Sequence, residues 1–378
     1  MTTMRAIGLM SGTSMDGIDI AALETDGETV TTRGPTRFAP YEAAFRRRLE
    51  AALETAKSIV DRRDRPGDLA DLEREITRRH VQAVRDFLAA VGEEWRSPSV
   101  VGFHGQTVLH RPGLGVTVQL GDGALLADEL AVPVVHDMRA NDMLRGGQGA
   151  PLVPAYHAAL ARSLPDAFVA QLPMVFVNIG GISNITYVPR DGDPIAFDTG
   201  PGNTLIDQWV SREAGVPFDA GGAIASEGSV VRSVVARYLD NAFFAKEGPK
   251  SLDRNDFNLD PAEGLELADG SRTLAAVSAE AILKSVEHLP EMPKLWIVCG
   301  GGRKNARIVD DLRAGAERMR ASVAVAEDAG LDGDATEAEA WAFLAARSLR
   351  GLPLTFPTTT GCKEPATGGV LNKPKGAR

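Results

Sequence analysis

Short apolar runs that end at glycine-containing turns recur along the chain and predict buried strands. Three of them cover Ala6–Met10, Met174–Ile179 and Leu295–Cys299. A buried strand that ends in glycine is the usual entry to a ligand loop in α/β proteins. Further strands are predicted at Ile18–Leu23, Val100–Phe103, Val116–Leu120, Val132–Val135, Ile185–Val188, Ile195–Phe197 and Val323–Ala326.

Segments with apolar residues at helical spacing lie between these strands. A first helix is predicted from the stripe formed by Phe45, Leu49, Leu53 and Val60. Asp68 is placed to cap a second helix, which ends at Gly92. Further helices are predicted over about 203–214, 228–245, 272–288, 304–319 and 336–350. The alternation of strands and helices indicates α/β layers.

Each half of the chain begins with a predicted β-hairpin around a glycine turn. Ile7–Met10 and Ile18–Leu23 flank the first turn, and Val175–Ile179 and Ile185–Val188 flank the second. No low-complexity linker separates the halves. The tail from about Pro357 holds Pro, Gly, Thr and Lys and is predicted to be loop with a frayed end.

Composition and charge exclude several classes of protein. The 378 residues suit two domains or one large one, and 41 basic against 51 acidic residues give a net charge of −10, which disfavours a nucleic-acid binder. Two cysteines, Cys299 and Cys362, exclude a disulfide framework and a cysteine zinc site. No apolar run approaches the ~18–20 residues of a membrane span, and the apolar start is too short for a signal peptide. We therefore expect a soluble, cytoplasmic protein.

The turn of the first hairpin is a candidate phosphate site. Its glycines allow close backbone approach, and successive N–H groups in such a turn form an anion-binding nest. The hydroxyls add donors, and Asp16 could hold a water on Mg²⁺. The lysine and spacing of a Walker loop are missing, and a plain turn is the alternative. The residues concerned are Ser11, Gly12, Thr13, Ser14, Asp16 and Gly17.

The second half carries two further glycine motifs. Asn178, Gly180 and Gly181 form the loop that matches the first turn, and two such loops fit a nucleotide whose phosphates lie between similar domains. The triple glycine Gly300, Gly301 and Gly302, followed by Asn305, comes after a strongly apolar strand and leads into a helix. Glycines there would let an adenine or ribose lie against the backbone, and a tight strand–helix turn is the alternative.

Polar residues at other strand ends are candidates for catalysis and sugar binding. Asp198 ends a strand just before a glycine turn, which suits a general base, although a helix-entry carboxylate would look the same. The loops after two further strands carry many hydrogen-bonding groups, which suits a hydroxyl-rich ligand such as a sugar. These groups are His104, Gln106, Thr107, Arg139, Asp142 and Gln148.

Taken in order, these motifs resemble the anhydro-N-acetylmuramic acid kinases, a family of anhydro-sugar kinases in the actin/sugar kinase/Hsp70 superfamily. The matching segments run over about residues 6–350. They are Gly8–Gly17, His104–Thr107, Gly146–Pro154, Asn178–Asn184, Phe197–Asn203, Gly248–Ser251 with Arg254 and Phe257, and Cys299–Gly302 with Asn305.

The resemblance implies a fold and a set of roles. It implies two actin-like, ribonuclease H-like domains flanking an ATP cleft, at 1–137 plus about 356–378 and at 138–355. Gly12, Thr13, Ser14 and Asp16 would hold phosphates, with Gly180 and Gly181 opposite, and the triple glycine would line the adenosine site. Asp198 would be the general base. Glu337 would lie near Mg²⁺ and the phosphates, although the helix dipole alone also favours a carboxylate there.

The implied reaction combines hydrolysis and phosphorylation. Asp198 would activate a water that attacks C1 of a 1,6-anhydro sugar, the C1–O6 bond would open, and O6 would take the γ-phosphoryl group of ATP. The product would be N-acetylmuramic acid 6-phosphate, an intermediate of peptidoglycan recycling. The family also suggests a homodimer, and neither nucleic acid nor a membrane is an expected partner.

One segment departs from the family pattern and keeps alternatives open. Members often carry Asp-Phe-Arg-Arg-Arg-Asp, whereas this chain keeps only Asp137, Arg139 and Asp142 of that run. A muramic acid carries a lactyl carboxylate that needs a cationic partner. A levoglucosan (1,6-anhydroglucose) kinase is therefore the alternative, and a non-kinase actin-like ATPase is a more distant one. A dinucleotide oxidoreductase is excluded because no G-x-G-x-x-G follows the first strand.

Overall fold

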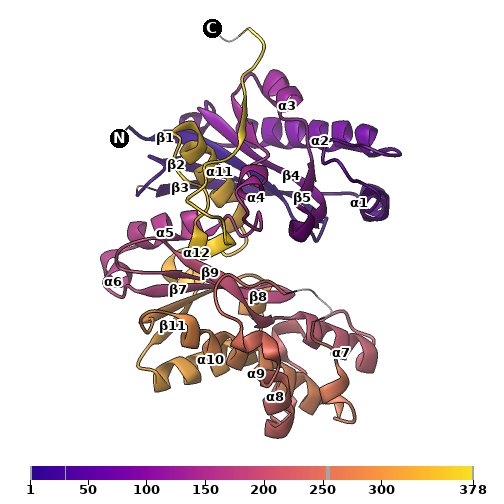
Figure 1. Ribbon diagram of the computed structural model, residues 1–378, viewed down its shortest axis with the longest axis vertical. Helices are drawn as coiled ribbons and strands as arrows, with labels where there is room; N and C mark the ends of the chain where they lie inside the picture. The colour runs from indigo at the N-terminus through magenta and orange to yellow at the C-terminus, as the bar shows by residue number, and fades with distance from the viewer. Residues whose placement is uncertain (1, 30, 253–255, 377–378) are drawn as a thin grey trace. The chain divides into compact units, whose positions relative to one another are not determined.

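The computed structural model describes residues 2–29, 31–252 and 256–376. Its contacts divide the chain into two compact units (Figure 1). Unit 1 comprises Met1–Ser163 and Ala335–Arg378, and unit 2 comprises Leu164–Asp334. Each unit is built around its own sheet. Arg254, part of one sequence motif, lies outside the described residues.

Unit 1 contains a seven-stranded sheet in the order β12-β6-β4-β1-β2-β3, with β5 paired to β4. The first three strands are antiparallel neighbours, while β4 runs parallel to both β1 and β6. The strands are β1 (Met4–Ser11), β2 (Gly17–Thr25), β3 (Thr31–Pro40), β4 (Val100–Arg111), β5 (Val116–Leu120), β6 (Val134–His136) and β12 (Val370–Asn372).

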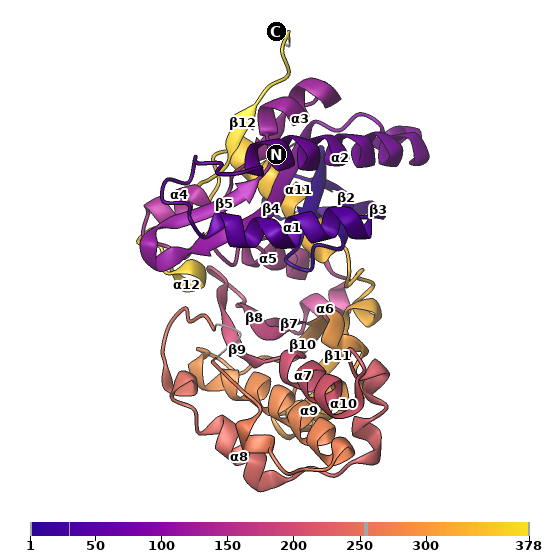
Figure 2. The same cartoon turned by 90° about the vertical axis from the view of Figure 1, so that its right-hand side faces the viewer.

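Helices cover both faces of this sheet (Figure 2). Ile7, Val101 and Phe103 pack with α2 and α3 on one face. The alternation of side chains along a strand turns Gly8 and Gly102 to the other face, where α11 lies. The helices of unit 1 are α1 (Ala43–Ala56), α2 (Leu69–Ala90), α3 (Gly123–Leu130), α4 (Ala140–Leu144), α5 (Pro154–Ser163), α11 (Thr336–Leu349) and α12 (Pro357–Thr360).

Unit 2 contains a five-stranded sheet in the order β11-β10-β7-β8-β9. Its core joins Trp296 of the sheet to Trp209 and Leu274 on the helices. The strands are β7 (Met174–Ile179), β8 (Ile182–Val188), β9 (Ile195–Pro201), β10 (Leu295–Cys299) and β11 (Ser322–Val325). The helices are α6 (Asp166–Val169), α7 (Thr204–Ala214), α8 (Arg232–Leu239), α9 (Leu267–Lys284) and α10 (Ala306–Arg318).

The two sheets share one topology. The order β3-β2-β1-β4-β6 in unit 1 corresponds to β9-β8-β7-β10-β11 in unit 2. In both, three antiparallel strands are followed by two parallel ones. The repeated hairpin, β1–β2 and β7–β8, is the one that the sequence predicts. The predicted α/β fold with two similar domains is therefore confirmed.

Several predicted elements differ from the structure. Val60 is 83% exposed because α1 already ends at Ala56. The helix predicted over 228–245 is the shorter α8, flanked by 3-10 turns at Ala225–Glu227 and Ala242–Ala245. The tail is not all loop, since it contains α12 and also β12, which pairs with β6.

The division into units also differs from the predicted one, which placed 138–355 in the second domain. The reason is packing: α11 lies against β1, β2 and β4, and α5 contacts both α11 and β3. Both helices therefore pack with the sheet of unit 1 and belong to that unit, not to unit 2. Across the described part of the chain, no helix has both the length and the apolar character needed to cross a membrane.

The close approach of α11 to the sheet predicts a strong effect of one methyl group. A Cβ on Gly102 would stand 2.0 Å from the carbonyl oxygen of Trp341 in α11, which backbone cannot easily relieve. We expect Gly102→Ala to lower the free energy of unfolding by about 3 kcal/mol, the upper end of overpacking effects. Gly113→Ala is the control, because no atom lies within 4 Å of its Cβ position. Chemical denaturation measures both, and equal stabilities would contradict the argument.

Candidate active site

The root of the β1–β2 turn is fixed by buried hydrogen bonds. The Ser11 hydroxyl is fully buried and donates to Oε1 of Gln106 at 2.7 Å. The Gln106 amide donates in turn to the Gly12 carbonyl at 3.0 Å. Tyr41 lies 3.1 Å from the Ser11 hydroxyl, and burial raises the pKa of this tyrosine to about 12. Both polar atoms of Gln106 are thus engaged with the turn, which indicates a positioning role; its predicted sugar contact remains a prediction.

The tip of the same turn presents polar groups to solvent. Thr13, Ser14 and Asp16 are exposed, and the Ser14 hydroxyl donates to Oδ1 of Asp16 at 2.6 Å. The Cβ position of Gly12 is open, with its nearest neighbour at 3.6 Å. Gly17 differs, because its Cβ would meet the ring of Phe38 at 2.5 Å. The open backbone therefore lies at Gly12–Ser14, while Gly17 serves strand packing.

His104 and Arg139 form a buried pair beside this turn. The imidazole Nδ1 lies 3.2 Å from the Ser11 carbonyl, and Nε2 lies 3.1 Å from a guanidinium nitrogen of Arg139. Burial and then the Arg139 charge lower the pKa of His104 to about 3, so the ring is neutral, donates from Nδ1 and accepts at Nε2. Arg139 also donates to the Gly149 carbonyl at 2.8 Å and stacks over Trp341. Thr107 lies 3.5 Å from the same Nε2.

Asp142 anchors the glycine-rich loop that follows α4. Its Oδ1 accepts from the hydroxyls of Thr355 at 2.5 Å and Thr360 at 2.6 Å, and its Oδ2 accepts from the Gly149 amide at 2.6 Å. The amide of Gln148 donates to the Thr360 carbonyl at 2.9 Å. These contacts indicate that Asp142 holds the loop in place. The sugar contacts expected of Asp142 and Gln148 stay predictions.

Two carboxylates of unit 1 are accessible for a metal-bound nucleotide. Asp16 is exposed on the hairpin turn, and Glu337 is exposed in the first turn of α11. Desolvation by the surrounding protein raises the pKa of Glu337, while the charge of Arg139 acts to lower it. Within the described residues, no three His, Cys, Asp or Glu side chains form a metal cage. This arrangement suits Mg²⁺ held mainly by phosphates and water, as this ion usually is.

The glycine turns of unit 2 meet at one edge of the sheet. Gly300 has φ +72°, and a Cβ there would stand 2.3 Å from Oδ1 of Asn178 on the neighbouring strand. The amide of Gly202 donates to the Gly181 carbonyl at 2.9 Å, and the Asn203 amide donates to Gly180 at 2.8 Å. The structure therefore brings together the predicted residues Asn178, Gly180, Gly181, Gly300, Gly301 and Gly302.

The turn formed by Gly300–Gly302 is held in place by Arg303 and its two acidic partners. Arg303 donates to the Gly300 carbonyl at 3.0 Å and pairs with Glu327 and Asp334. Asn305 caps α10, because its Oδ1 accepts from the amides of Arg307 at 3.1 Å and Ile308 at 3.4 Å. Its predicted role in ATP binding is not tested by this contact. The sequence alone does not mark Arg303 as a residue of the site.

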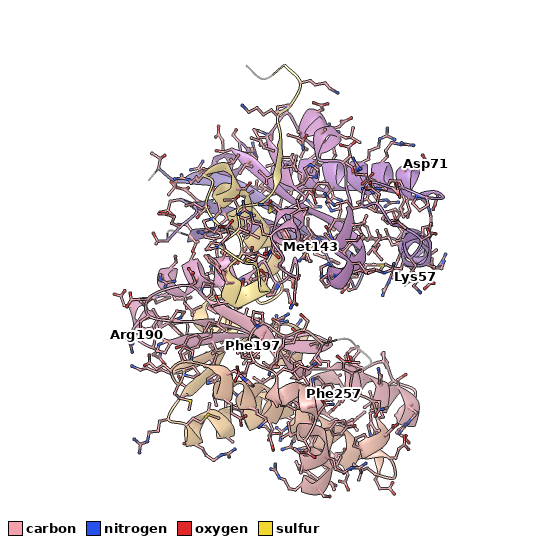
Figure 3. All side chains as sticks on the ribbon, in the orientation of Figure 1. Lys57, Asp71, Met143, Arg190, Phe197 and Phe257 are labelled. Atoms are coloured by element: carbon pink, nitrogen blue, oxygen red, sulfur yellow. The ribbon has the colours of Figure 1, made fainter. Side chains whose placement is uncertain are left out.

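Asp198 lies half-buried in the middle of β9, which continues to Pro201 and therefore does not end at Asp198 as the sequence suggests. It directly follows Phe197 of the core, which Figure 3 labels. Its Oδ2 accepts from the Leu252 amide at 2.8 Å, and its own amide donates to the Lys250 carbonyl at 2.9 Å. The described residues place no hydrogen bond on Oδ1. Burial raises the pKa of Asp198 to about 6, against the lowering effect of the Leu252 amide. The group is thus a carboxylate whose proton affinity suits a general base near neutral pH.

Lys250 fixes the backbone that holds Asp198. Its buried ammonium lies 2.9 Å from the Lys246 carbonyl, 3.2 Å from that of Phe244 and 3.1 Å from Nε2 of His288. Burial lowers the pKa of this lysine. Lys250 belongs to the Gly248–Ser251 motif, but nothing in the sequence alone gives this lysine a role.

A family model described as anhydro-N-acetylmuramic acid kinase matches residues 4–374. The chain belongs to this family. The protein of that name from Agrobacterium fabrum is 58% identical over 97% of this chain and 98% of its own length. The one from Brucella canis is 59% identical over 98% and 99%.

Membership of the anhydro-N-acetylmuramic acid kinase family makes the protein an ATP-dependent sugar kinase. The confirmed two-domain α/β fold agrees with this class. A solved structure of a ROK family glucokinase from Streptomyces griseus, in complex with glucose and AMPPNP, matches with a TM-score of 0.39 and 15% identity. That match covers 91% of this chain and 99% of the glucokinase chain.

The contacts of Lys250 predict an effect on the pH dependence of this family member. Lys250→Met removes the ammonium that ties the loop, so the Leu252 amide shifts away from Asp198 and the pKa of the carboxyl rises further. We expect kcat/KM to fall about ten- to a hundredfold, the usual cost of a small misplacement, and the acid limb of its pH profile to move to higher pH. Lys246→Met is the control, since its exposed side chain leaves the carbonyl contact intact. An unchanged acid limb in Lys250→Met would refute the positioning role.

Proposed function

We propose that the protein opens the 1,6-anhydro ring of 1,6-anhydro-N-acetylmuramic acid and phosphorylates O6, with ATP as the donor. The product is N-acetylmuramic acid 6-phosphate, which enters peptidoglycan recycling. The names of the relatives support the substrate. The environment of Asp198 is the observation that supports the ring-opening mechanism. We further propose that the enzyme acts in the cytoplasm as a homodimer.

Asp198 provides the base of the proposed reaction. Its Oδ1 takes a proton from a water molecule while the water oxygen attacks C1 of the sugar. The C1–O6 bond breaks, and its electron pair stays on O6. O6 then forms the new bond to the γ-phosphorus of ATP, and ADP leaves with the electron pair of the old bond. The Leu252 amide keeps Oδ2 occupied, which orients Oδ1 toward the water.

The glycine turns provide sites for the nucleotide in this proposal. The exposed tip at Gly12, Thr13 and Ser14 offers backbone N–H groups and hydroxyls to the phosphates. The turns of unit 2, with Asn178 and Asn305, would take further phosphate oxygens and the adenosine. Mg²⁺ bound with ATP would offset phosphate charge, and the exposed carboxylates of Asp16 and Glu337 would hold its waters.

The sugar-side residues fall into two groups. The first group makes most of its hydrogen bonds within the group or to loop backbone; its members are His104, Gln106, Arg139 and Asp142. They would shape the sugar site mainly by fixing its loops. Thr107, on β4, and Gln148, on the loop after α4, would contact the sugar hydroxyls directly.

A second substrate is favoured by one segment. Ala140 and Asn141 stand where the family often has arginine, which removes two cations that a lactyl carboxylate would attract. 1,6-Anhydroglucose, which has no carboxylate, is therefore the competing substrate.

The position of the phosphate tests the proposed reaction. We expect ADP release to depend on 1,6-anhydro-N-acetylmuramic acid, and the product to show phosphorus coupled to the C6 protons and a free reducing C1 in its NMR spectra. Reactions with 1,6-anhydroglucose and without sugar are the controls. Phosphate on another hydroxyl, with the 1,6 bridge intact, would rule out the coupled mechanism. Turnover with 1,6-anhydroglucose alone would assign the other substrate.

Asp198→Asn tests the base. The amide cannot take the proton, so we expect kcat to fall about 10²–10⁴-fold while ATP binding is kept. The raised pKa of Asp198 means that ionisation of this carboxyl, which occurs as pH rises through about 6, destabilises the fold. Because the substitution removes this charge, the variant should unfold at an equal or higher temperature. In the wild type, kcat/KM should decline as pH falls through about 6. Retained turnover in a folded Asn variant would exclude Asp198 as the base.

A further inference from the structure

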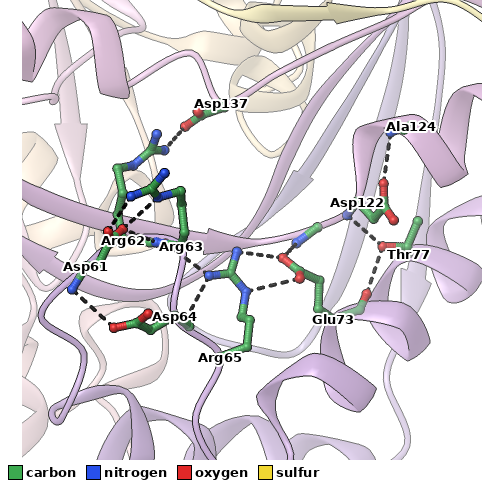
Figure 4. A network of polar contacts seen from close by, with 11 residues as sticks. Asp61, Arg62, Arg63, Asp64, Arg65, Glu73, Thr77, Asp122, Ala124 and Asp137 are labelled. Atoms are coloured by element: carbon green, nitrogen blue, oxygen red, sulfur yellow. Dashed lines mark hydrogen bonds and ion pairs between the residues drawn. The ribbon is translucent and has the colours of Figure 1, made fainter.

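Unit 1 contains a cavity that neither the nucleotide turns nor the base uses. Its volume is about 170 Å³, roughly that of five or six liquid water molecules. Arg62, Arg63 and Arg65 enter it from the loop between α1 and α2, and Figure 4 shows the polar network around them. The rest of its wall comes from the strand ends of the sheet: Phe103, His104, Gly105, Gln119, Gly121, His136 and Asp137.

The lining of the cavity contains three arginines and one acidic residue. Arg65 pairs with Glu73 through two hydrogen bonds of 2.8 and 3.0 Å, and Arg63 pairs with Asp61. Neither Glu73 nor Asp61 belongs to the lining. Each of the three guanidinium groups thus has a carboxylate partner, and Asp137, the acidic residue of the lining, is the partner of Arg62. The two imidazoles add no charge near neutral pH, because burial lowers the pKa of both His104 and His136.

Arg62 is the cation with unused hydrogen-bonding capacity. One guanidinium nitrogen contacts Oδ1 of Asp137, while the buried Nε has no partner in the part of the chain that the structure describes. Arg65, in contrast, commits all three nitrogens: two to Glu73, and the third to the carbonyls of Arg62 and Asp64. Arg65 thus fixes the backbone from which Arg62 enters the cavity.

Asp137 occupies a strained backbone position. Its φ is +55°, in the left-handed region that residues other than glycine seldom adopt. Such positions often mark functional sites, where the surrounding structure enforces them. Asp137 also begins the segment that has lost two arginines compared with the family pattern. The ion pair between Asp137 and Arg62 therefore joins the 137–142 segment to the loop between α1 and α2, which carries three arginines.

We propose that this cavity binds the carboxylate substituent of the sugar. Arg62 gives up its ion pair with Asp137 and pairs with the sugar carboxylate instead. This inference rests on the proposed function, since it names the group that distinguishes the two candidate substrates. The cavity adjoins His104 and Gly105 of β4, the strand that also carries Gln106 and Thr107 among the predicted sugar residues. A planar guanidinium suits a carboxylate through two parallel hydrogen bonds. Arg139 commits two guanidinium nitrogens, to Gly149 and His104, and its Nε, like that of Arg62, has no partner among the described residues. Arg62 commits one nitrogen, to Asp137, and so has more donors to offer.

The test compares two sugars that differ in the lactyl group. In Arg62→Gln, KM for 1,6-anhydro-N-acetylmuramic acid should rise about ten- to a hundredfold, the usual loss for one charge-assisted contact. KM for 1,6-anhydro-N-acetylglucosamine, which lacks the lactyl group, should stay within about twofold. Arg85→Gln is the matched control, because Arg85 pairs with Glu129 away from the cavity, and it should change neither value. Thermal melts verify that each variant is folded.

A second variant separates the carboxylate from a purely structural pair. Asparagine tolerates the left-handed conformation, so Asp137→Asn removes the competing charge and keeps the backbone. KM for the muramic acid should then stay equal or fall. A rise similar to that of Arg62→Gln, or equal changes for both sugars in Arg62→Gln, would overturn the cavity proposal. A wild-type enzyme that phosphorylates neither sugar would instead refute the proposed function.

Discussion

The contact between α11 and the two central strands of unit 1 sets the position of most groups in that half of the site. At Gly8 and Gly102 the backbone of the helix approaches the sheet more closely than any side chain would permit. The same helix carries Glu337 at its start and Trp341 one turn later. Trp341 donates to the Met10 sulfur at 3.1 Å and lies 4.7 Å from the His104 ring. Strand, imidazole and carboxylate are thereby held by a single packing interface.

In unit 2, hydrogen bonds between backbone groups, rather than side chains, join the glycine turns. The amides of Gly202 and Asn203 reach the carbonyls of Gly181 and Gly180. A Cβ on Gly302 would meet Ile179 at 2.2 Å, so packing requires glycine there, whereas the Cβ position of Gly301 is open, with its nearest neighbour at 3.9 Å. Because glycine leaves the backbone uncovered, turns that pack closely in this way can also present N–H groups to a ligand.

The sequence predicted the elements that carry strong local signals and missed those that depend on partners. The hairpins and the strand before Gly300 were predictable because apolar runs end at glycine. Strand β3 was not, since Thr31–Pro40 is a largely exposed edge strand with Gly34 and Pro35 inside it. The placement of α11 with the first sheet was also hidden, because only the three-dimensional match to Gly8 and Gly102 reveals it.

The same distinction applies to the candidate site. The types of the residues were enough to select Asp198, His104 and the glycine turns as candidates. They did not reveal which polar atoms already have hydrogen-bond partners within the protein. Gln106 and Asp142 read as ligands in the sequence, yet their atoms are engaged with neighbouring loops. Lys250 and Arg62 gave little signal, since a lysine or arginine in a loop is ordinarily a solvated residue.

Burial, more than neighbouring charge, sets the protonation of the central groups. It keeps His104 neutral, so that the imidazole can accept from Arg139 while donating to the hairpin turn. It raises the pKa of Asp198 only to about 6, because the Leu252 amide still stabilises the carboxylate. A fully buried aspartate would stay protonated at neutral pH, and a fully solvated one would be a weaker base. The half-buried position of Asp198 in β9 gives a carboxylate that is ionised at neutral pH and still basic enough to accept a proton from water.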